Sequence, residues 1–508
     1  MTFRLAALVA AVAIAFADSA IVVLALPDLL AQYDVSINGV AWVVTAYNVA
    51  LALGALALAF FGRRFDPARL AFAGGVVFAI ASLVCAVAPD VWVLIAFRAV
   101  QGVAAAGLLV GALPVMRSLA PGRGAALWAG AGVFGTALGP ALGGALTEGF
   151  TWRAIFYAQA PVAALGALAL VGLGGRGTWA GEAAPRARLG SVALAFASAA
   201  LVGLLFLAVV LLVDVWRLSP LGAGAAVSVI PLATLLAAPV AARAGAPAVA
   251  AGAVLLAAGL AGMAFLPARG LAWVVVALAI AGLGFGLIMP RLTRTTTGAN
   301  AVWIRHAGLV VGLLVITPVL TADLTSAGDR AKLRGISVAL DAPAPAETKL
   351  KLAVHLVPVL SRTQKELPSF TKAVASEQDP ALTAIGRELD NVVQATITRA
   401  FRRSFLIAAL FALLAALTVA VSARRLRLSA AALLVGIVLV GTELASGATT
   451  YGTRPKLYGP CAERPSQGIG LAALDFVACR LHKSREQLVA DVASAGGSAL
   501  DTLEQLSR

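Results

Sequence analysis

Residues 5–27 read LAALVAAVAIAFADSAIVVLALP, a run in which Asp18 is the only charged residue. An α-helix rises about 1.5 Å per residue, so this run is long enough to cross a hydrocarbon core of about 30 Å. A cleavable signal peptide has a shorter apolar core, and this run is the first of a series of similar ones. Residues 5–27 therefore predict a membrane-spanning helix.

The rest of the chain repeats this pattern. Hydrophobic residues make up 61% of the 508 residues and charged residues 12%, whereas soluble domains are about half apolar and a quarter charged. We therefore expect an all-α membrane protein with about 12–13 transmembrane helices. After the first, the expected spans are 40–61, 70–88, 92–113, 125–147, 154–174, 191–213, 221–242, 246–266, 271–290, 306–322, 404–422 and 429–448.

The formal net charge of +15 reflects membrane topology rather than nucleic-acid binding. Short loops on one side of the predicted bundle carry many Arg residues, such as Arg63, Arg117 and Arg243, and the opposite short loops carry few. Such loops face the cytoplasm. We expect a multi-pass protein of the bacterial inner membrane with a cytoplasmic N-terminus, an extracytoplasmic C-terminal tail and no nucleic-acid partner.

The order of the runs divides the chain into two sets of helices. Transporters are often built from such repeats, with the substrate site between them near the middle of the membrane. The expected parts are an N-terminal six-helix bundle (1–174), a cytoplasmic linker (175–190), the first part of a C-terminal bundle (191–322), an extracytoplasmic helical loop (323–403), the last two transmembrane helices (404–448) and an extracytoplasmic tail (449–508).

The predicted tail contains Cys461 and Cys479. An oxidising compartment outside the membrane would allow them to form a disulfide, and the alternative is two unpaired thiols. No Cys or His spacing resembles a metal site, so we expect neither a metal nor a cofactor.

Five motifs in register resemble the drug:proton antiporters of the major facilitator superfamily. They are DSAIVVLALP (18–27), WVVTAY (42–47), RAVQG (98–102), GTALGPALGG (135–144) and WRAIF (152–156). The resemblance is best over residues 1–170. It implies a two-bundle transporter that alternates access to its two sides and exchanges protons for small molecules.

The sequence departs from the family pattern in the first motif, where the usual Thr and Asn are Ala20 and Val23, and again in the loop after the second predicted helix. Between the second and third predicted helices the family has Gly-x-Leu-x-Asp-Arg-x-Gly-Arg, and residues 59–66 here read AFFGRRFD. Arg63 occupies the position of the family's acid. The family's charge pair at the cytoplasmic gate is therefore either rebuilt from Arg63, Arg64 and Asp66 in another arrangement, or lost.

Asp18 and Arg98 are the predicted proton-coupling residues. A charged group at the centre of a membrane helix costs about 2.5–3.5 kcal/mol on insertion scales, so such a group is by default functional and faces the bundle interior. In the family resembled, the position of Arg98 is thought to take part in proton transfer, and Gln101 follows one turn later. The alternatives are a permanently neutral or backbone-capped Asp18, and an Arg98 that only ties helices together. Glu443 lies near the outer end of the last run, and this position favours a structural role for it.

Three residues of the second helix are candidates for the substrate pathway: Trp42, Tyr47 and Asn48. Asn48 can also supply a hydrogen bond to the coupling pair. Trp42 falls near a predicted helix end, where indole rings often act as interfacial anchors instead.

The antiporter-like motif contains Gly135, Gly139, Pro140, Gly143 and Gly144. Small residues spaced by four allow membrane helices to approach closely, and proline can bend a helix. We expect this face to contact another helix closely, as a rocking interface requires. Simple tight packing is the alternative.

These observations favour a secondary exporter over an enzyme. The sequence has no HExxH, GxSxG or GxxxxGKS motif, which argues against hydrolysis and ATP-driven transport. The expected partners are a small amphipathic substrate, protons and the lipid bilayer, with an extracytoplasmic protein partner left open. Export of an envelope lipid or amino acid, and a membrane sensor or scaffold that transports nothing, are the alternatives.

Overall fold

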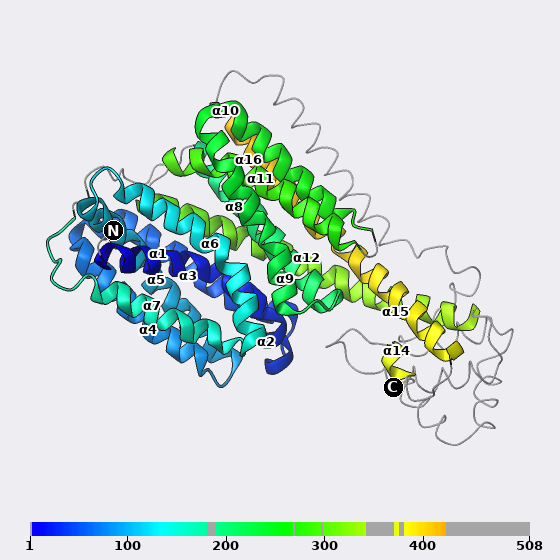
Figure 1. The fold of residues 1–508 in the computed structure, drawn as a ribbon. Coiled ribbons are helices and arrows are strands. Elements are labelled where there is room, and N and C mark those ends of the chain that lie inside the picture. Colours follow the sequence, from blue (N-terminus) through cyan, green and yellow to red (C-terminus); the bar gives the residue numbers. More distant parts are fainter. Residues whose placement is uncertain are drawn as a thin grey trace. The chain divides into compact units, whose positions relative to one another are not determined.

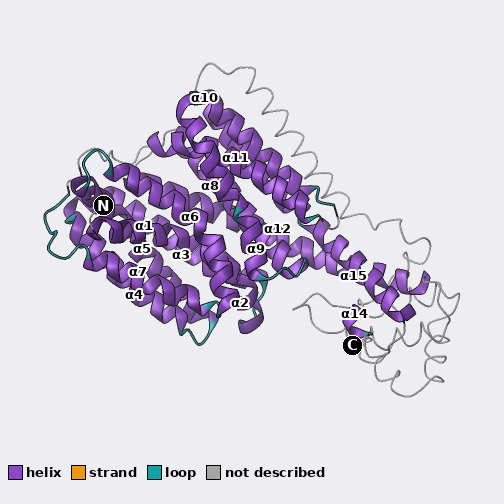
Figure 2. Cartoon of the chain, in the orientation of Figure 1, coloured by secondary structure: helices purple, strands orange, loops and turns teal. Residues whose placement is uncertain are grey.

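A computed structural model describes residues 3–177, 179, 189–267, 270–295, 298–341, 370–374 and 380–422. Helices joined by short loops make up this part of the chain, which contains no strand (Figure 2). The chain divides into two compact units, the first formed by Met1–Thr321 with Phe401–Leu444 and the second by Ala322–Ala400 with Ala445–Arg508. The all-α fold expected from the sequence is confirmed.

The first unit begins with the helices coloured blue to cyan in Figure 1. Helix α5 packs against α3 and α4, while α1 packs against α6 and α7. Ser36 and Asp66 cap the N-termini of α3 and α4 by accepting hydrogen bonds from backbone N–H groups. The elements are α1 (Phe3–Ile21), η1 (Val22–Ala25), α2 (Leu26–Tyr33), α3 (Ile37–Phe61), η2 (Gly62–Arg64), α4 (Pro67–Ala86), α5 (Val91–Leu119), α6 (Gly124–Gly149) and α7 (Arg153–Leu168).

The remaining helices of the first unit follow residue 188. In this group α16 packs against α8 and α10, and α10 packs against α11. The elements are α8 (Leu189–Val210), η3 (Leu211–Val215), α9 (Pro220–Val227), α10 (Val229–Ala264), α11 (Leu271–Thr295), α12 (Gly298–Asp341) and α16 (Arg402–Ser422). Helix α12 begins in the first unit and ends in the second.

Helix α10 folds back on itself. A Cβ atom built on Gly282 of α11 would lie 2.4 Å from the carbonyl oxygen of Ile230, and one built on Gly284 would lie 2.4 Å from that of Gly252. Ile230 and Gly252 would be about 33 Å apart in a straight helix, too far to reach neighbouring positions of α11. The expected spans 221–242 and 246–266 therefore correspond to two arms on either side of α11.

Helix α6 is bent by 43° between Gly124–Thr136 and Leu138–Gly149. Pro140 explains the position of the bend, because a proline ring clashes with the carbonyl group four residues earlier, here that of Thr136. Nine helices of the described residues are long and apolar enough to span a bilayer, and ten if α6 counts as one span.

Many large apolar side chains lie on the outside of the first unit, which fits a protein surrounded by lipid. Examples are Leu53, Ile80, Val103, Leu236 and Val276. In water such a surface would drive association.

The second unit contains the end of α12 with α14 (Phe370–Ala373) and α15 (Pro380–Ala400). The Asp390 carboxylate accepts hydrogen bonds from the backbone N–H groups of Phe370 and Thr371, at 2.7 and 3.2 Å, and so ties α14 to α15. The last expected span (429–448) with Glu443, residues 180–188 of the linker, and the Cys461–Cys479 pair lie outside the described residues.

Candidate functional site

A cluster of polar side chains lies among the helices from α1 to α7. Its members are Asp18 of α1, Ser82 of α4, Arg98 and Gln101 of α5, and Gln159 of α7, and all five have an exposed fraction of 0%. Buried polar groups are costly unless they bond to one another, so this cluster must be internally paired.

Asp18 and Arg98 form a buried ion pair, with Arg98 Nη1 donating to Asp18 Oδ2. The other oxygen, Oδ1, accepts a hydrogen bond of 2.6 Å from Gln159 Nε2. Gln101 connects Arg98 to Gln159. Its Oε1 accepts a hydrogen bond of 2.6 Å from Arg98 Nη1, and its Nε2 donates one of 3.0 Å to Gln159 Oε1. The structure thus brings together Asp18, Arg98 and Gln101, the three residues predicted for proton coupling.

Arg98 is held on several sides. Its Nε donates to the carbonyl oxygen of Val43 at 3.0 Å, and its guanidinium lies 4.3 Å from the centre of the Tyr47 ring and 5.7 Å from that of Phe156. Nη2 is buried without a hydrogen-bond partner in the described residues. Because a buried charge without its counter-charge is costly, any change in the charge of Asp18 acts directly on Arg98.

The three pathway candidates of α3 lie apart from the cavity described below. Tyr47 and Asn48 are fully buried beside the cluster: the Tyr47 hydroxyl donates to the carbonyl oxygen of Ala15 at 2.7 Å, and Asn48 Oδ1 accepts from the Ser19 hydroxyl at 2.9 Å. Trp42 is 43% exposed. None of the three lines the cavity.

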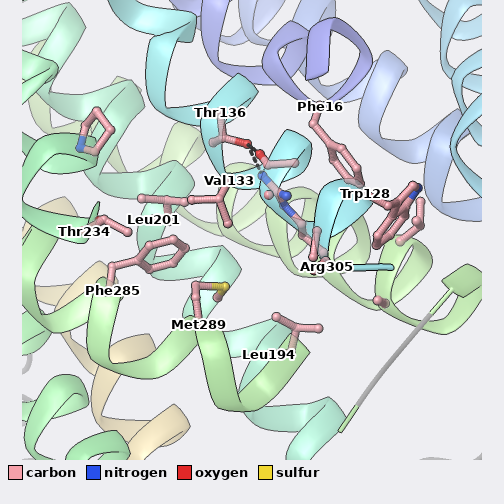
Figure 3. Close-up of a pocket in the computed structure, with 18 of the residues that line it drawn as sticks. Phe16, Trp128, Val133, Thr136, Leu194, Leu201, Thr234, Phe285, Met289 and Arg305 are labelled. Atoms are coloured by element: carbon pink, nitrogen blue, oxygen red, sulfur yellow. Dashed lines mark hydrogen bonds between the residues drawn. The ribbon is translucent and has the colours of Figure 1, made fainter. Parts of the chain in front are cut away.

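The first unit contains a cavity of about 640 Å³ between its earlier and later helices (Figure 3). Its walls are mostly apolar, with the side chains of Thr136, Thr234, Arg117 and Arg305 as polar members. Apolar walls with a few polar groups are typical of small-molecule sites. Labelled apolar lining residues are Phe16, Trp128, Val133, Leu194, Leu201, Phe285 and Met289.

Helix α1 connects the cavity to the buried cluster. Phe16 lines the cavity two residues before Asp18, and its ring contacts Trp128 edge-on at 5.4 Å and His306 in a stacked arrangement at 6.2 Å. Arg305 of α12 lies 5.1 Å from the centre of the same ring. Residues of α1 thus lie both in the buried cluster and in the wall of the cavity.

Sequence reasoning missed Gln159, Phe16, Trp128 and Arg305. Gln159 had a signal, since it is a polar residue inside an apolar run. Arg305 was hidden because the span was expected to begin at 306, whereas α12 begins at Gly298 and places Arg305 about two turns inside the helix. Phe16 and Trp128 carry no signal that distinguishes them from other apolar residues of their helices.

The antiporter-like motif forms close backbone contacts on two faces of α6. Cβ atoms built on Gly135 and Gly143 would lie 2.0 and 2.4 Å from the carbonyl oxygens of Ala13 and Ile21 on α1. Gly139 faces the same helix. The close packing expected of the motif is present.

The other face of α6 meets α9. A Cβ atom on Gly144 would lie 2.4 Å from the Pro220 carbonyl oxygen, and one on Gly224 would lie 2.8 Å from that of Pro140. Glu148 Oε2 accepts a hydrogen bond of 2.8 Å from the backbone N–H of Leu221 in the first turn of α9. The motif thus joins an early helix of the chain to a later one.

The predicted gate residues lie at the turn between α3 and α4. Asp66 caps α4, and its second oxygen accepts a hydrogen bond of 2.8 Å from the backbone N–H of Gly175. Arg64 lies 5.4 Å from the centre of the Phe61 ring. Asp66 thus ties the start of α4 to the start of the expected linker.

Within the described residues, no three His, Cys, Asp or Glu side chains gather as a metal site would require.

Comparison with curated proteins finds similarity over part of the chain. It is 33% identical over 155 residues to the multidrug resistance protein Stp of Mycobacterium tuberculosis, a match that covers 30% of this chain and 29% of Stp. It is 34% identical over 150 residues to the multidrug efflux pump LfrA of Mycolicibacterium smegmatis, covering 28% of this chain and 30% of LfrA. Each match thus spans less than a third of either protein.

The fold has a solved counterpart. A bacterial homologue of the human lysosomal transporter Spinster, in an inward-facing and occupied conformation, aligns with a TM-score of 0.55 and 18% identity over 83% of this chain and 96% of that one. The Major Facilitator Superfamily model matches residues 8–318, more than half of the chain. The family's members are transporters rather than enzymes, as the sequence analysis expected. The chain, a multi-pass membrane protein, belongs to the Major Facilitator Superfamily.

Proposed function

We propose that the protein is a proton-coupled exporter of amphipathic small molecules that works by alternating access. The observation that carries the proposal is the buried ion pair between Asp18 and Arg98, bonded through Gln101 and Gln159. Such a pair is expensive to bury, and replacing one with apolar residues is often neutral or stabilising, so stability alone gives no reason for it. A role in proton transfer would explain why the ion pair is present.

Protonation of Asp18 would remove the negative charge that faces Arg98. The guanidinium would then keep the carbonyl of Val43, the oxygen of Gln101 and the Tyr47 ring as partners, but no counter-charge in this cluster. The pair therefore has two electrostatic states that favour different packing of α1 against α5. A path that opens to one side of the membrane at a time converts these states into proton uptake on one side and release on the other.

The position of α1 supplies the link to cargo. Asp18 and Phe16 lie on the same helix, and Phe16 forms part of the cavity wall. Helix α1 also packs without intervening side chains against Gly135 and Gly143 of α6, so movement of α1 is transmitted to α6. Proton binding at Asp18 thus changes the cavity without direct contact between proton and cargo.

Two further considerations support export by secondary transport. Proton entry supplies about 2.3 kcal/mol per charge for each 100 mV of membrane potential, which is enough to move a small molecule against a gradient. Two of the relatives carry the names multidrug resistance protein and multidrug efflux pump. The cytoplasmic N-terminus and extracytoplasmic tail inferred from loop charges remain part of this proposal.

The test is transport by the purified protein in proteoliposomes with an imposed pH gradient. The probes share one aromatic body and differ in charge: 2-naphthylethylammonium, 2-naphthylacetamide and 2-naphthylacetate. The parent protein should concentrate at least one of them only when the gradient is present, and Asp18→Asn should abolish this response while equilibration across the membrane persists.

Asp28→Asn is the matched control, because Asp28 lies in α2, the short helix that follows α1 and η1, outside the buried cluster. It should transport like the parent. Uphill transport by Asp18→Asn at the parental rate would refute the proposed coupling. Failure of the parent to move any of the probes, in protein shown to be folded, would count against the amphipathic substrate class.

A further inference from the structure

The cavity wall contains an arginine side chain, Arg305, that has no counter-charge among the described residues. Arg305 lies in α12, about two turns from the start of the helix, and lines the cavity. Its Nη2 donates a hydrogen bond of 2.6 Å to the Thr136 hydroxyl, and its guanidinium faces the Phe16 ring at 5.1 Å (Figure 3). Both partners are neutral. Within the described part of the chain, no carboxylate forms an ion pair with Arg305.

The contrast with Arg98 is informative. Both are arginines in membrane helices, and Arg98 is paired with Asp18. A guanidinium has five N–H donors, and Thr136 accepts from only one of those of Arg305. Charges in apolar surroundings are stable when paired, so the donors of Arg305 that face the cavity are available to an anion.

The other charge in the cavity lining is also positive. Among the described residues, Arg117 at the end of α5 is the one other charged member of the lining, which contains no Asp or Glu. The other wall residues are mainly apolar, with Phe16, Trp128 and Phe285 supplying aromatic surface. Such a site complements a molecule with an apolar body and one negative group.

We propose that the cargo of this transporter is an amphipathic organic anion whose carboxylate or phosphate binds Arg305 while its apolar part contacts the Phe16, Trp128 and Phe285 walls. This inference rests on the proposed export function and specifies its substrate class. An aromatic acid from the aqueous phase and a single-chain lipid with an anionic head group share this chemistry. A cavity of about 640 Å³ has room for either.

Binding to the purified protein, measured by isothermal titration calorimetry without any pH gradient, tests the assignment. A hydrogen-bonded charge pair should make 2-naphthylacetate bind at least about tenfold more tightly than 2-naphthylacetamide or 2-naphthylethylammonium. Dodecyl phosphate, measured against dodecanol, provides the lipid-like arm. The arm with the larger preference for the anion identifies the source of the cargo.

Variants locate the charge. Arg305→Gln should reduce the preference for the anion to less than about twofold, and Arg305→Lys should retain part of it because the positive charge remains. Arg117→Gln is the matched control, since it removes the other cavity cation, and it should leave most of the preference in place. Each variant is used only if it elutes and melts like the parent.

The proposal is overturned if the parent binds the ammonium probe as tightly as the carboxylate. It is also overturned if Arg305→Gln retains the preference or if Arg117→Gln alone removes it. The comparison of probes on the parent protein remains decisive even where a variant does not fold. If the parent protein binds the anion but shows no proton-coupled transport, only the proposed coupling is contradicted. If it shows coupled transport of the ammonium probe alone, only this substrate class is contradicted.

Discussion

Replacement of Gly135 by alanine should force α1 and α6 apart. The new Cβ atom would lie 2.0 Å from the carbonyl oxygen of Ala13, and contacts of this kind essentially never fall below 3.0 Å, so the helices must separate by about 1 Å at this point. The obstacle is backbone rather than a flexible side chain. Overpacking typically costs about 1–3 kcal/mol, and the backbone contact favours the upper end of that range.

The assay is unfolding of the purified protein in a detergent titration, with Gly130→Ala as the matched control. Gly130 lies in the same helix, and a Cβ atom added there would meet no other atom within 4 Å, so alanine at this position should leave stability unchanged or raise it by up to about 1 kcal/mol through helix propensity. Equal stability of the two variants would refute the conclusion that α1 and α6 are in backbone contact.

Three further predictions concern the polar groups. Arg98→Ala should lower the free energy of unfolding by about 3–5 kcal/mol because it leaves Asp18 buried and unpaired, and the double variant Asp18→Asn/Arg98→Gln should lose less, as a double-mutant cycle would measure. Gln159→Leu should cost about 1–3 kcal/mol in the same assay by removing the hydrogen bond to Asp18 Oδ1, and an unchanged value would contradict that bond. Asp66→Ala should cost about 0.5–2 kcal/mol as the cap of α4 and speed limited proteolysis near Gly175, whose N–H it also binds; unaltered cleavage would refute the linker contact.

Sequence reasoning succeeded where one residue type carries a large physical cost. Asp18 and Arg98 were identifiable because a charge in an apolar run requires a partner, and both lie in one cluster. The glycines of the antiporter-like motif were identifiable because their spacing places them on common helix faces. These patterns also predicted the all-α fold and the family.

Other features depend on packing between distant segments. The cavity wall formed by Phe16, Trp128 and Phe285 consists of residue types common throughout membrane helices, so no local signal distinguishes them. Arg305 fell one residue outside the expected span 306–322 because hydropathy alone did not extend that span to Gly298. The break between the arms of α10 was expected at 242–246, but only the contacts of Ile230 and Gly252 with α11 show how the arms lie.

The contact between α6 and α9 has a mechanical consequence. Gly144 and Gly224 bring the two backbones together, and Pro220 and Pro140 supply the opposing carbonyl groups. Helix surfaces without protruding side chains can tilt against one another while staying in contact. In the alternating access proposed above, this contact would therefore act as the pivot of the movement. A small tilt about this contact would separate the two helices most at the ends farthest from it. A larger side chain at Gly144 would block the tilt and would leave the groups that bind the cargo intact.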